Sequence, residues 1–237
     1  MSRPVSGWFE SLPADRLLVE ISLWSGNFGR LAEDIARTDH LTDIYHLDVA
    51  DGHFAPTLLF FPDLVACIRR LTTKPLHVHL MAMDAILRAQ IEQFAEAGAD
   101  IISIHAENVN VSHALALIKQ LGRVAGLVLQ LQTPVSAAQP YLDSIGVLTL
   151  LGTPIGVKGQ GLDPRAEPRL REAQYLLAQR ARSQRTILVA DGGIREHTVA
   201  GLRLAGAEAI VMGSFAFNAP DLTQRIAWVH KLPMGPK

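Results

Sequence analysis

The sequence predicts an α/β protein that folds as a single (β/α)8 TIM barrel, and three observations support this prediction. Short β-rich runs alternate with amphipathic segments along the whole chain. Most of these runs are continuously apolar, which is typical of parallel strands that are covered on both faces. Polar side chains gather at the carboxyl ends of the runs, where barrel active sites lie. A doubly wound open sheet is the alternative, but the count of eight β–α units favours a closed barrel.

The alternation gives eight candidate strands separated by helical segments. Two of these segments end on glycine, which signals the end of a helix: Ile91–Ala97 precedes Gly98, and Val199–Ala205 precedes Gly206. The candidate strands are Leu17–Leu23, Ile44–Val49, Leu76–Leu80, Ile101–His105, Gly126–Leu131, Val147–Leu151, Ile187–Ala190 and Ala209–Met212.

The 237 residues fit one barrel domain over residues 17–237, preceded by an extension over residues 1–16. That extension is expected either to cap the barrel bottom or to form an oligomer contact. A hydrophobic fraction of 49% against a charged fraction of 19% allows a large core. A net charge of −1 leaves no basic stripe for nucleic acid or anionic lipid. Without a signal-peptide core or a membrane-spanning run, we expect a cytoplasmic homo-oligomer.

The single cysteine, Cys67, rules out an internal disulfide framework and a cysteine-based zinc site. It lies within the apolar run Leu64–Ile68. This position predicts a buried structural thiol rather than a nucleophile.

Two histidines and two acids lie at the ends of three predicted strands. His46 and Asp48 alternate along one strand and therefore share its face, as do His77 and His79 on the next. Asp191 ends the seventh run, across the barrel. Each could be an ordinary loop residue, but the position of all four at strand ends favours a single divalent ion held by His46, Asp48, His79 and Asp191. Imidazole and carboxylate ligands suit zinc, iron, manganese or cobalt without choosing among them.

The two acids also suggest the chemistry. Asp48 and Asp191 would flank the ion from opposite sides of the barrel mouth. This geometry suits a proton acceptor on one face of a carbon and a donor on the other, as epimerisation next to a carbonyl requires. A cation would stabilise the charge that develops on the enediolate oxygens.

Small residues after the last three strands predict a phosphate site. Glycine pairs follow strands seven and eight, where barrels frequently bind phosphate through backbone N–H groups. A loop after strand six, with a lysine, is placed to close over the same anion. The alternative is that the glycines only make tight turns. The predicted contacts are Gly156, Lys158, Gly159, Gly192, Gly193, Gly213 and Ser214.

From about Glu20 to Phe217, these residues resemble the ribulose-phosphate 3-epimerase family. The segment 46–56, HLDVADGHFAP, resembles that family's H-x-D-x-x-D-G-x-F-x-P motif. The segment 78–81, VHLM, is similar to the family's VHLM, and 189–194, VADGGI, resembles its VDGGI. Three separate motifs in the right order make a chance match improbable.

The resemblance implies an isomerase that acts on carbohydrates, in pentose phosphate metabolism. The reaction would epimerise C3 of a ketose phosphate through a metal-stabilised enediolate. The reaction would interconvert D-ribulose 5-phosphate and D-xylulose 5-phosphate, or act on a related tetrulose, pentulose or hexulose phosphate. The resemblance implies the four metal ligands named above, with Asp48 and Asp191 as the acid–base pair. It also implies that Ser22, His79 and Met81 lie near the substrate.

Several positions depart from the family pattern. Ala50 replaces one of the family's methionines, and Leu151 or a neighbouring residue replaces another. The family's N-P-G-F-G-G-Q segment reads TPIGVKGQ at 153–160, with a cation at Lys158. Thr57 and Phe61 replace an asparagine and a small residue. Since the metal ligands are kept and residues around the sugar change, we expect that D-ribulose 5-phosphate is not clearly the best substrate.

Two other functions remain open at this point. One is another sugar-phosphate barrel enzyme, an isomerase or decarboxylase, because fold alone does not decide function. The other is a non-catalytic sugar-phosphate binding protein, which the retention of all four ligands disfavours. Of the remaining histidines, His77 is expected to be a hydrogen-bonded core residue, whereas His105 is equally compatible with a substrate contact.

Overall fold

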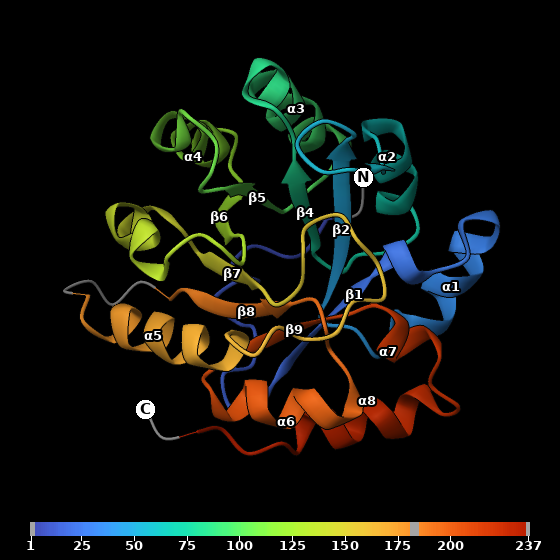
Figure 1. The fold of residues 1–237 in the computed structure, drawn as a ribbon. Coiled ribbons are helices and arrows are strands. Elements are labelled where there is room, and N and C mark those ends of the chain that lie inside the picture. The colour runs from blue at the N-terminus through green and yellow to red at the C-terminus, as the bar shows by residue number, and fades with distance from the viewer. Residues whose placement is uncertain (1–2, 181–184, 236–237) are drawn as a thin grey trace.

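The computed structural model describes residues 3–180 and 185–235, which form a closed barrel of parallel strands surrounded by helices (Figure 1). The predicted TIM barrel is confirmed. The first strand pairs in parallel with both the second and the last, so the sheet closes on itself. The parallel strands are β1 (Leu18–Ser22), β2 (Ile44–Asp51), β4 (Leu76–Met81), β5 (Ile101–His105), β6 (Val124–Leu129), β7 (Val147–Leu151), β8 (Ile187–Asp191) and β9 (Ala209–Met212).

The helices lie outside the barrel and connect successive strands (Figure 1). The α-helices are α1 (Leu31–Thr38), α2 (Pro62–Arg69), α3 (Asp84–Ala97), α4 (Val111–Gln120), α5 (Ala166–Ala178), α6 (Glu196–Leu204), α7 (Ser214–Phe217) and α8 (Leu222–His230). Short 3₁₀ segments are η1 (Leu23–Ser25), η2 (Phe28–Arg30) and η3 (Val135–Ser144). Among the described residues, no helix is both long and apolar enough to cross a membrane.

Local sequence signals explain where the helices begin and end. Helix α2 starts with Pro62, whose fixed φ and missing N–H suit a first helical position. Helix α3 ends at Gly98, which has a φ of 110° and faces the stem of buried Arg69. A side chain there would be strained and would meet Arg69 Cγ at 2.6 Å. Helix α8 is capped by Asp221, which accepts a hydrogen bond from the backbone N–H of Gln224.

Two connections differ from a plain strand-to-helix alternation. After β2 the chain forms β3 (Leu58–Leu59), which pairs antiparallel with the end of β2. After β6 it forms η3, a run of 3₁₀ turns, instead of an α-helix. Pro140 lies inside this segment and lacks the N–H that an α-helix would use. Strand β6 also begins and ends two residues earlier than predicted, because pairing with β5 starts at Val124.

The expectation of a buried Cys67 is wrong. The cysteine is exposed on α2, while Val65 and Ile68 on the same helix are buried. In a surface helix only the residues at helical spacing along one stripe face the core, and Cys67 lies off that stripe. Its Sγ accepts a hydrogen bond from Arg70.

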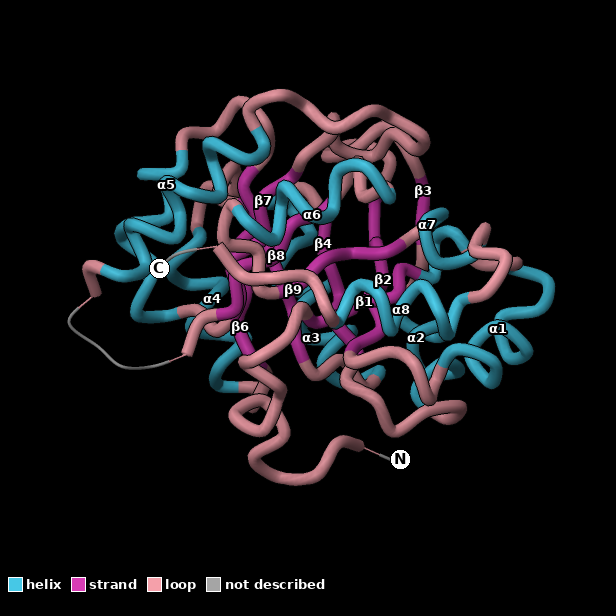
Figure 2. The backbone as a smooth tube through the Cα atoms, turned by 90° about the horizontal axis from the view of Figure 1, so that it is seen from below, coloured by secondary structure: helices cyan, strands magenta, loops and turns pink. Residues whose placement is uncertain are grey.

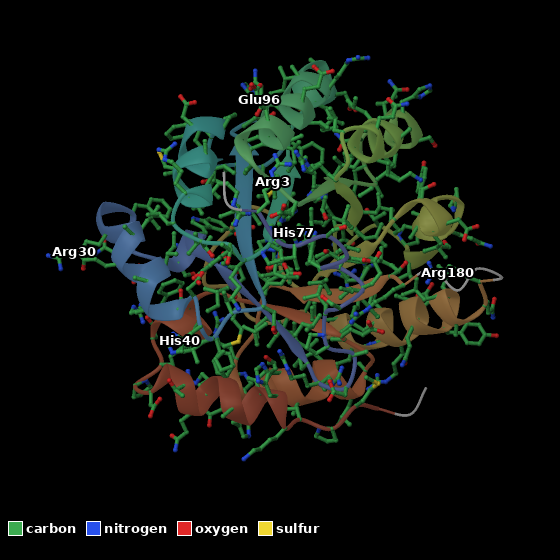
Figure 3. The ribbon with its side chains drawn as sticks, turned by 180° about the vertical axis from the view of Figure 1, so that it is seen from behind. Arg3, Arg30, His40, His77, Glu96 and Arg180 are labelled. Atoms are coloured by element: carbon green, nitrogen blue, oxygen red, sulfur yellow. The ribbon has the colours of Figure 1, made fainter. Side chains whose placement is uncertain are left out.

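The barrel interior is stacked in layers of different polarity. The lowest layer is apolar and includes Leu18, Ile44, Ile101, Val147, Ile187 and Ala209. Two residues further along each strand the side chains point to the same interior. There the buried residues are polar on five strands, and Figure 3 shows His77 near the centre of the barrel. We call this set the central layer: Glu20, His46, His77, Ser103 and Thr149.

The N-terminal segment closes the apolar end of the barrel. Trp8, Phe9 and Leu12 pack against the lowest layer, and Phe9 is 8% exposed. The Arg185 guanidinium donates to the carbonyls of Leu12 and Pro13, which holds the segment in place. Figure 2 shows this segment at one end of the barrel and the loop between β7 and α5 at the other. Residues 1–2 of the predicted extension lie outside the described residues.

This packing predicts that Phe9→Ala destabilises the barrel from the end opposite the pocket. Removing a buried aromatic ring costs about 3 kcal/mol of unfolding free energy. Chemical denaturation monitors the loss, and Tyr175→Ala, which removes a ring that is 69% exposed, serves as the control with a change within about 0.5 kcal/mol. Equal stability of the two variants would show that the segment does not cap the barrel in solution.

Candidate active site

Strand register brings the predicted site residues together. In the pairing of β2 with β4, His46 lies opposite His77 and Asp48 lies opposite His79. In the pairing of β1 with β2, Ser22 lies opposite His46. These side chains therefore enter the barrel at two successive heights, at the carboxyl ends of neighbouring strands.

The four predicted metal ligands converge on one point. Each of His46, Asp48, His79 and Asp191 offers an atom that lies within 4.8 Å of the others' atoms. His46 Nε2 is 3.4 Å from Asp48 Oδ1, and His79 Nδ1 is 3.3 Å from the same oxygen. Asp191 Oδ2 approaches from β8, 3.9 Å from His46 Nε2 and 3.6 Å from His79 Nδ1. The two imidazoles thus present different ring nitrogens to the same space.

The chemistry of this cluster fits a divalent cation. His46 Nε2 is buried and has no hydrogen-bond partner among the described residues. A buried polar atom without a partner is costly, and coordination would satisfy it. Two imidazole nitrogens and two carboxylates form a ligand set that zinc, iron, manganese and cobalt accept.

Burial and neighbouring charge separate the two acids. Burial works to raise the pKa of Asp48, but the imidazoles of His46 and His79 outweigh it and hold that pKa below its ordinary value. Burial raises the pKa of Asp191 to about 6; His46 opposes this rise and the charge of Asp48 adds to it. A positive charge between the two carboxylates would relieve their repulsion.

A buried carboxylate supports His46 from below. Glu20 Oε2 lies 2.8 Å from His46 Nδ1 and 2.8 Å from His77 Nδ1. Against its burial, His77 and His46 lower the pKa of Glu20 to about 2. The second ring nitrogen of His77 lies 2.6 Å from Ser103 Oγ, and burial lowers the pKa of His77. His77 is therefore the hydrogen-bonded core residue that the sequence predicts.

A second buried chain supports His79. Its Nε2 lies 2.8 Å from His105 Nε2, and His105 Nδ1 lies 2.9 Å from Glu107 Oε2. Burial lowers the pKa of His105 to about 4. His105 is fully buried, so it contacts His79 instead of a substrate. Sequence reasoning missed Glu20 and Glu107, although a lone charged residue inside an apolar strand was a signal for Glu20.

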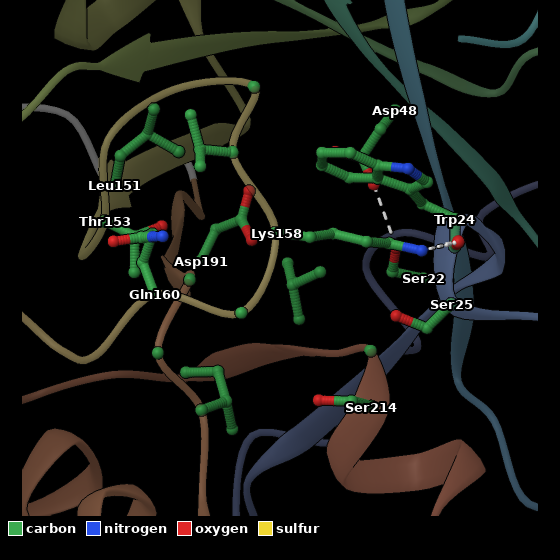
Figure 4. Close-up of a pocket in the computed structure, with 18 of the residues that line it drawn as sticks. Ser22, Trp24, Ser25, Asp48, Leu151, Thr153, Lys158, Gln160, Asp191 and Ser214 are labelled. Carbon is green, nitrogen blue, oxygen red and sulfur yellow. Dashed lines mark hydrogen bonds between the residues drawn. The ribbon is translucent and has the colours of Figure 1, made fainter. Parts of the chain in front are cut away.

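A pocket of about 320 Å³ opens above the cluster (Figure 4). Asp48, His79 and Asp191 reach its wall, whereas His46 lies beneath it. The Ser22 hydroxyl donates to Asp48 Oδ2 at 2.8 Å and so orients that carboxylate. All ten residues predicted to contact substrate line this pocket: Ser22, His79, Met81, Gly156, Lys158, Gly159, Gly192, Gly193, Gly213 and Ser214.

Glycines on one side of the pocket bring backbone close to its interior. Gly192 and Gly193 follow β8 with φ values of 89° and 70°, a region that side chains rarely adopt. A Cβ at Gly192 would meet Thr153 Oγ1 at 2.3 Å, and one at Gly193 would meet the backbone of Leu162. Only glycine fits here, and the backbone N–H groups that it leaves accessible suit an anion.

Comparison with known proteins shows the family of this chain. The model of the ribulose-phosphate 3-epimerase family matches residues 18–217. The chain belongs to this family. A ribulose-phosphate 3-epimerase of Synechocystis is 36% identical over 217 residues, which cover 90% of this chain and 93% of the relative. The Escherichia coli K12 protein of the same name is 35% identical, over 86% of this chain and 90% of the relative.

More distant structures share only the fold. A 3-hexulose-6-phosphate synthase from Salmonella typhimurium superimposes with a TM-score of 0.69 at 12% identity, covering 91% of this chain and 98% of that one. An orotidine 5'-phosphate decarboxylase from Pyrococcus horikoshii gives a TM-score of 0.63 at 14% identity, covering 90% and 97%. These similarities show a common barrel architecture.

The five positions that depart from the family's sequence pattern lie in different parts of the structure. Leu151 and Lys158 line the pocket. Ala50 lies on β2 and is buried next to Met81, whereas Phe61 is 58% exposed. Neither of these, nor Thr57, belongs to the pocket wall. Of the five replaced positions, only Leu151 and Lys158 therefore reach the pocket wall.

The loop after β7 crosses the pocket and contacts the opposite side. The Lys158 ammonium donates to the Trp24 carbonyl and lies 5.1 Å from the centre of the Trp24 ring (Figure 4). Burial lowers the pKa of Lys158, while the charge of Asp48 opposes this change. Arg195 and Asn218 also line the pocket, and the sequence did not single them out.

The cluster predicts that purified protein carries about one equivalent of a divalent metal. His46→Ala and His79→Ala each remove one ligand and should lower the bound metal to a small fraction of an equivalent. Elemental analysis of the purified proteins measures this. The matched control is His113→Ala, which removes an exposed imidazole on α4 and should leave the metal content unchanged. Full activity in a chelated, metal-free preparation would contradict the prediction.

Proposed function

We propose that this chain is an isomerase that epimerises a ketose phosphate at C3. One observation carries the proposal: Asp48 and Asp191 approach one buried imidazole pair from different strands, at the wall of a single pocket. Two acids at one centre provide a proton acceptor and a proton donor for opposite faces of a carbon. The relatives named ribulose-phosphate 3-epimerase support the same reaction class.

Each acid has a definite part in the reaction. One carboxylate removes the proton from C3, and the other, held as the acid, returns a proton to the opposite face. Because epimerisation runs in both directions, the two residues exchange these roles with the direction of turnover. The Ser22 hydroxyl donates a 2.8 Å hydrogen bond to Asp48 Oδ2, and this bond keeps the Asp48 carboxylate directed at the pocket.

His46, Asp48, His79 and Asp191 would hold one divalent ion, whose charge offsets the negative charge that develops on the substrate oxygens. The remaining residues bind and orient the sugar phosphate. Backbone N–H groups at Gly192, Gly193 and Gly213 offer donors to the phosphate. The loop that carries Lys158 covers the pocket and limits the access of water.

The two-acid arrangement separates this proposal from its rivals. An isomerase or decarboxylase needs only one acid at one face of the substrate, so it would leave the second carboxylate without a function. A binding protein would need neither acid near the imidazoles. The synthase and decarboxylase structures share the barrel with this chain at 12–15% identity, which supports no transfer of their reactions.

The proposal predicts a strong preference for phosphorylated ketoses. Purified, metal-loaded protein is assayed against ketose phosphates of four, five and six carbons and against the free sugars. We expect kcat/KM at least about 10³-fold higher with the phosphate, because the backbone donors would otherwise lose their partner. Equal efficiency on a free sugar would contradict the phosphate site.

The same panel identifies the sugar. The relatives' name specifies ribulose phosphate, whereas Leu151 and Lys158 change the wall of this pocket. We expect another ketose phosphate to match or exceed D-ribulose 5-phosphate in kcat/KM. A lead of tenfold or more for D-ribulose 5-phosphate would show that these two replacements leave specificity unchanged.

A further prediction concerns the two proposed acid–base residues. Asp48→Asn and Asp191→Asn should each reduce turnover by at least about 10²-fold, since each removes a general acid–base group. Metal content is measured for each variant, because both residues are also proposed ligands. Asp163→Asn, which changes a carboxylate outside the pocket wall, is the control and should keep the parent rate.

Proton exchange distinguishes the two acids from simple ligands. In deuterated water, a variant that keeps one working acid should still exchange the substrate proton on one face while failing to invert the carbon. Epimerisation at the parent rate by both metal-loaded variants would overturn the assignment.

A further inference from the structure

Two glutamates outside the ligand set lie at the ends of buried hydrogen-bond chains that lead to the two histidines. Glu20 contacts His46 directly, and Glu107 contacts His79 through His105. Glu20, His46, His77 and His105 are fully buried, and His79 is 2% exposed. The Glu107 side chain is 23% exposed, but water does not reach the four histidines, so each proton between them and the carboxylates has to serve a protein atom.

When a metal ion occupies His46 Nε2, the chain to His46 admits one arrangement of protons. An ionised carboxylate only accepts hydrogen bonds. Since Glu20 Oε2 lies 2.8 Å from Nδ1 of both His46 and His77, both of these nitrogens carry a proton. His77 then accepts from the Ser103 hydroxyl through its other nitrogen, at 2.6 Å. Against its burial, the neighbouring carboxylates raise the pKa of His46, so a metal ion has to displace the Nε2 proton; Nε2, which has no hydrogen-bond partner among the described residues, is the atom that faces Asp48 and Asp191.

In the chain to His79 the two ring nitrogens exchange roles: Nε2 contacts the supporting residue and Nδ1 faces the proposed metal site. Glu107 Oε1 accepts from the Gln130 backbone and the Thr133 hydroxyl, and its Oε2 faces His105 Nδ1 at 2.9 Å. His105 Nδ1 therefore donates, and its bare Nε2 accepts from His79 Nε2. A metal ion that binds His79 then uses Nδ1, the atom that faces the two aspartates, while Nε2 keeps its proton for His105.

We propose that Glu20 and Glu107 are positioning residues that fix opposite tautomers of His46 and His79, so that both rings present a lone pair to one metal ion. Neither glutamate belongs to the four-ligand cluster or lines the pocket. The inference rests on the metal site of the proposed function. It adds that carboxylates up to two rings away hold the second ring nitrogen of each histidine and so orient the other towards the ion, as outer-shell partners of metal-bound histidines do.

The orientation of Glu107 makes one substitution especially informative. In Glu107→Gln, the amide oxygen has to stay with the Gln130 and Thr133 donors, so the NH₂ group faces His105 Nδ1. That NH₂ donates, His105 moves its proton to Nε2, and His79 is driven to carry its proton on Nδ1. The shape of the side chain is unchanged, but the lone pair that faces the metal site is lost.

Glu20 needs a different substitution. In Glu20→Gln the amide oxygen can occupy the Oε2 position and still accept from both imidazoles, so the effect should be small. In Glu20→Leu no acceptor remains, and His46 is free to carry its proton on Nε2. The control is Thr149→Val in the same central layer, because Thr149 Oγ1 is buried without a hydrogen-bond partner among the described residues.

The test uses the full-length protein with ¹⁵N-labelled histidine, loaded with Zn²⁺ alone. In wild type, NMR should show the proton of His46 on Nδ1 and that of His79 on Nε2. Competition with a chelator should show Zn²⁺ affinity lowered about 10- to 100-fold in Glu107→Gln and Glu20→Leu. Glu20→Gln and Thr149→Val should stay within about threefold of wild type.

Thermal unfolding of the metal-free variants shows whether a variant has lost stability in general. Such a loss would have no effect on the tautomers measured in wild type. The opposite tautomer of either histidine in wild type, or Zn²⁺ affinity in folded Glu107→Gln within twofold of wild type, would overturn the proposal. If a variant fails to fold, the wild-type spectrum still decides. Predicted tautomers in a protein that epimerises no ketose phosphate would refute the proposed function and leave this inference standing.

Discussion

The register between β2 and β4 is the constraint on which the site depends. It sets Asp48 beside His79 and His46 beside His77 over six consecutive residue pairs. A slip of one residue in either strand would turn that strand's site side chains towards the helices. The apolar residues between them, Leu47 and Val78, would then enter the polar interior, so the packing of the helices against the sheet protects the register that the chemistry needs.

The barrel interior accepts buried charge because it is layered. Below the site, apolar side chains fill the bottom of the barrel, and Phe9 and its neighbours seal it from water. Above this seal, Glu20 and the two aspartates are held near imidazoles. Unpaired ions at this depth would be strongly unfavourable, and each carboxylate is offset by hydrogen-bond donors or by the proposed cation. The same low polarity strengthens the electrostatic interaction between a bound cation and a developing negative charge.

Much of this organisation is visible in the sequence because it follows from short-range patterns. The apolar runs and the period of two along each strand located the barrel strands to within two residues and placed His46, Asp48 and His79 on interior faces. Glycine after a helical pattern located the end of α3, where a positive φ is required. Patterns of this kind depend on neighbouring residues alone.

The features that the sequence did not show depend on contacts between distant strands. Glu20 and His77 are 57 positions apart, and no spacing rule connects them before the barrel closes. The link from His79 through His105 to Glu107 likewise crosses two strands and a loop. The exposure of Cys67 shows the limit of reading an apolar run without its helical phase.

The division between strands and loops also indicates where specificity changes. The proposed ligands and their supporting carboxylates lie on strands or directly after them, where pairing fixes their positions. Lys158 lies on a loop and is held by Trp24 from the opposite side of the pocket. A contact of this kind can change without disturbing the register below it, because loops tolerate substitution better than paired strands. With Ala50, Thr57 and Phe61 outside the pocket wall, the named replacements that reach the pocket lie at the end of β7 and in the loop that follows.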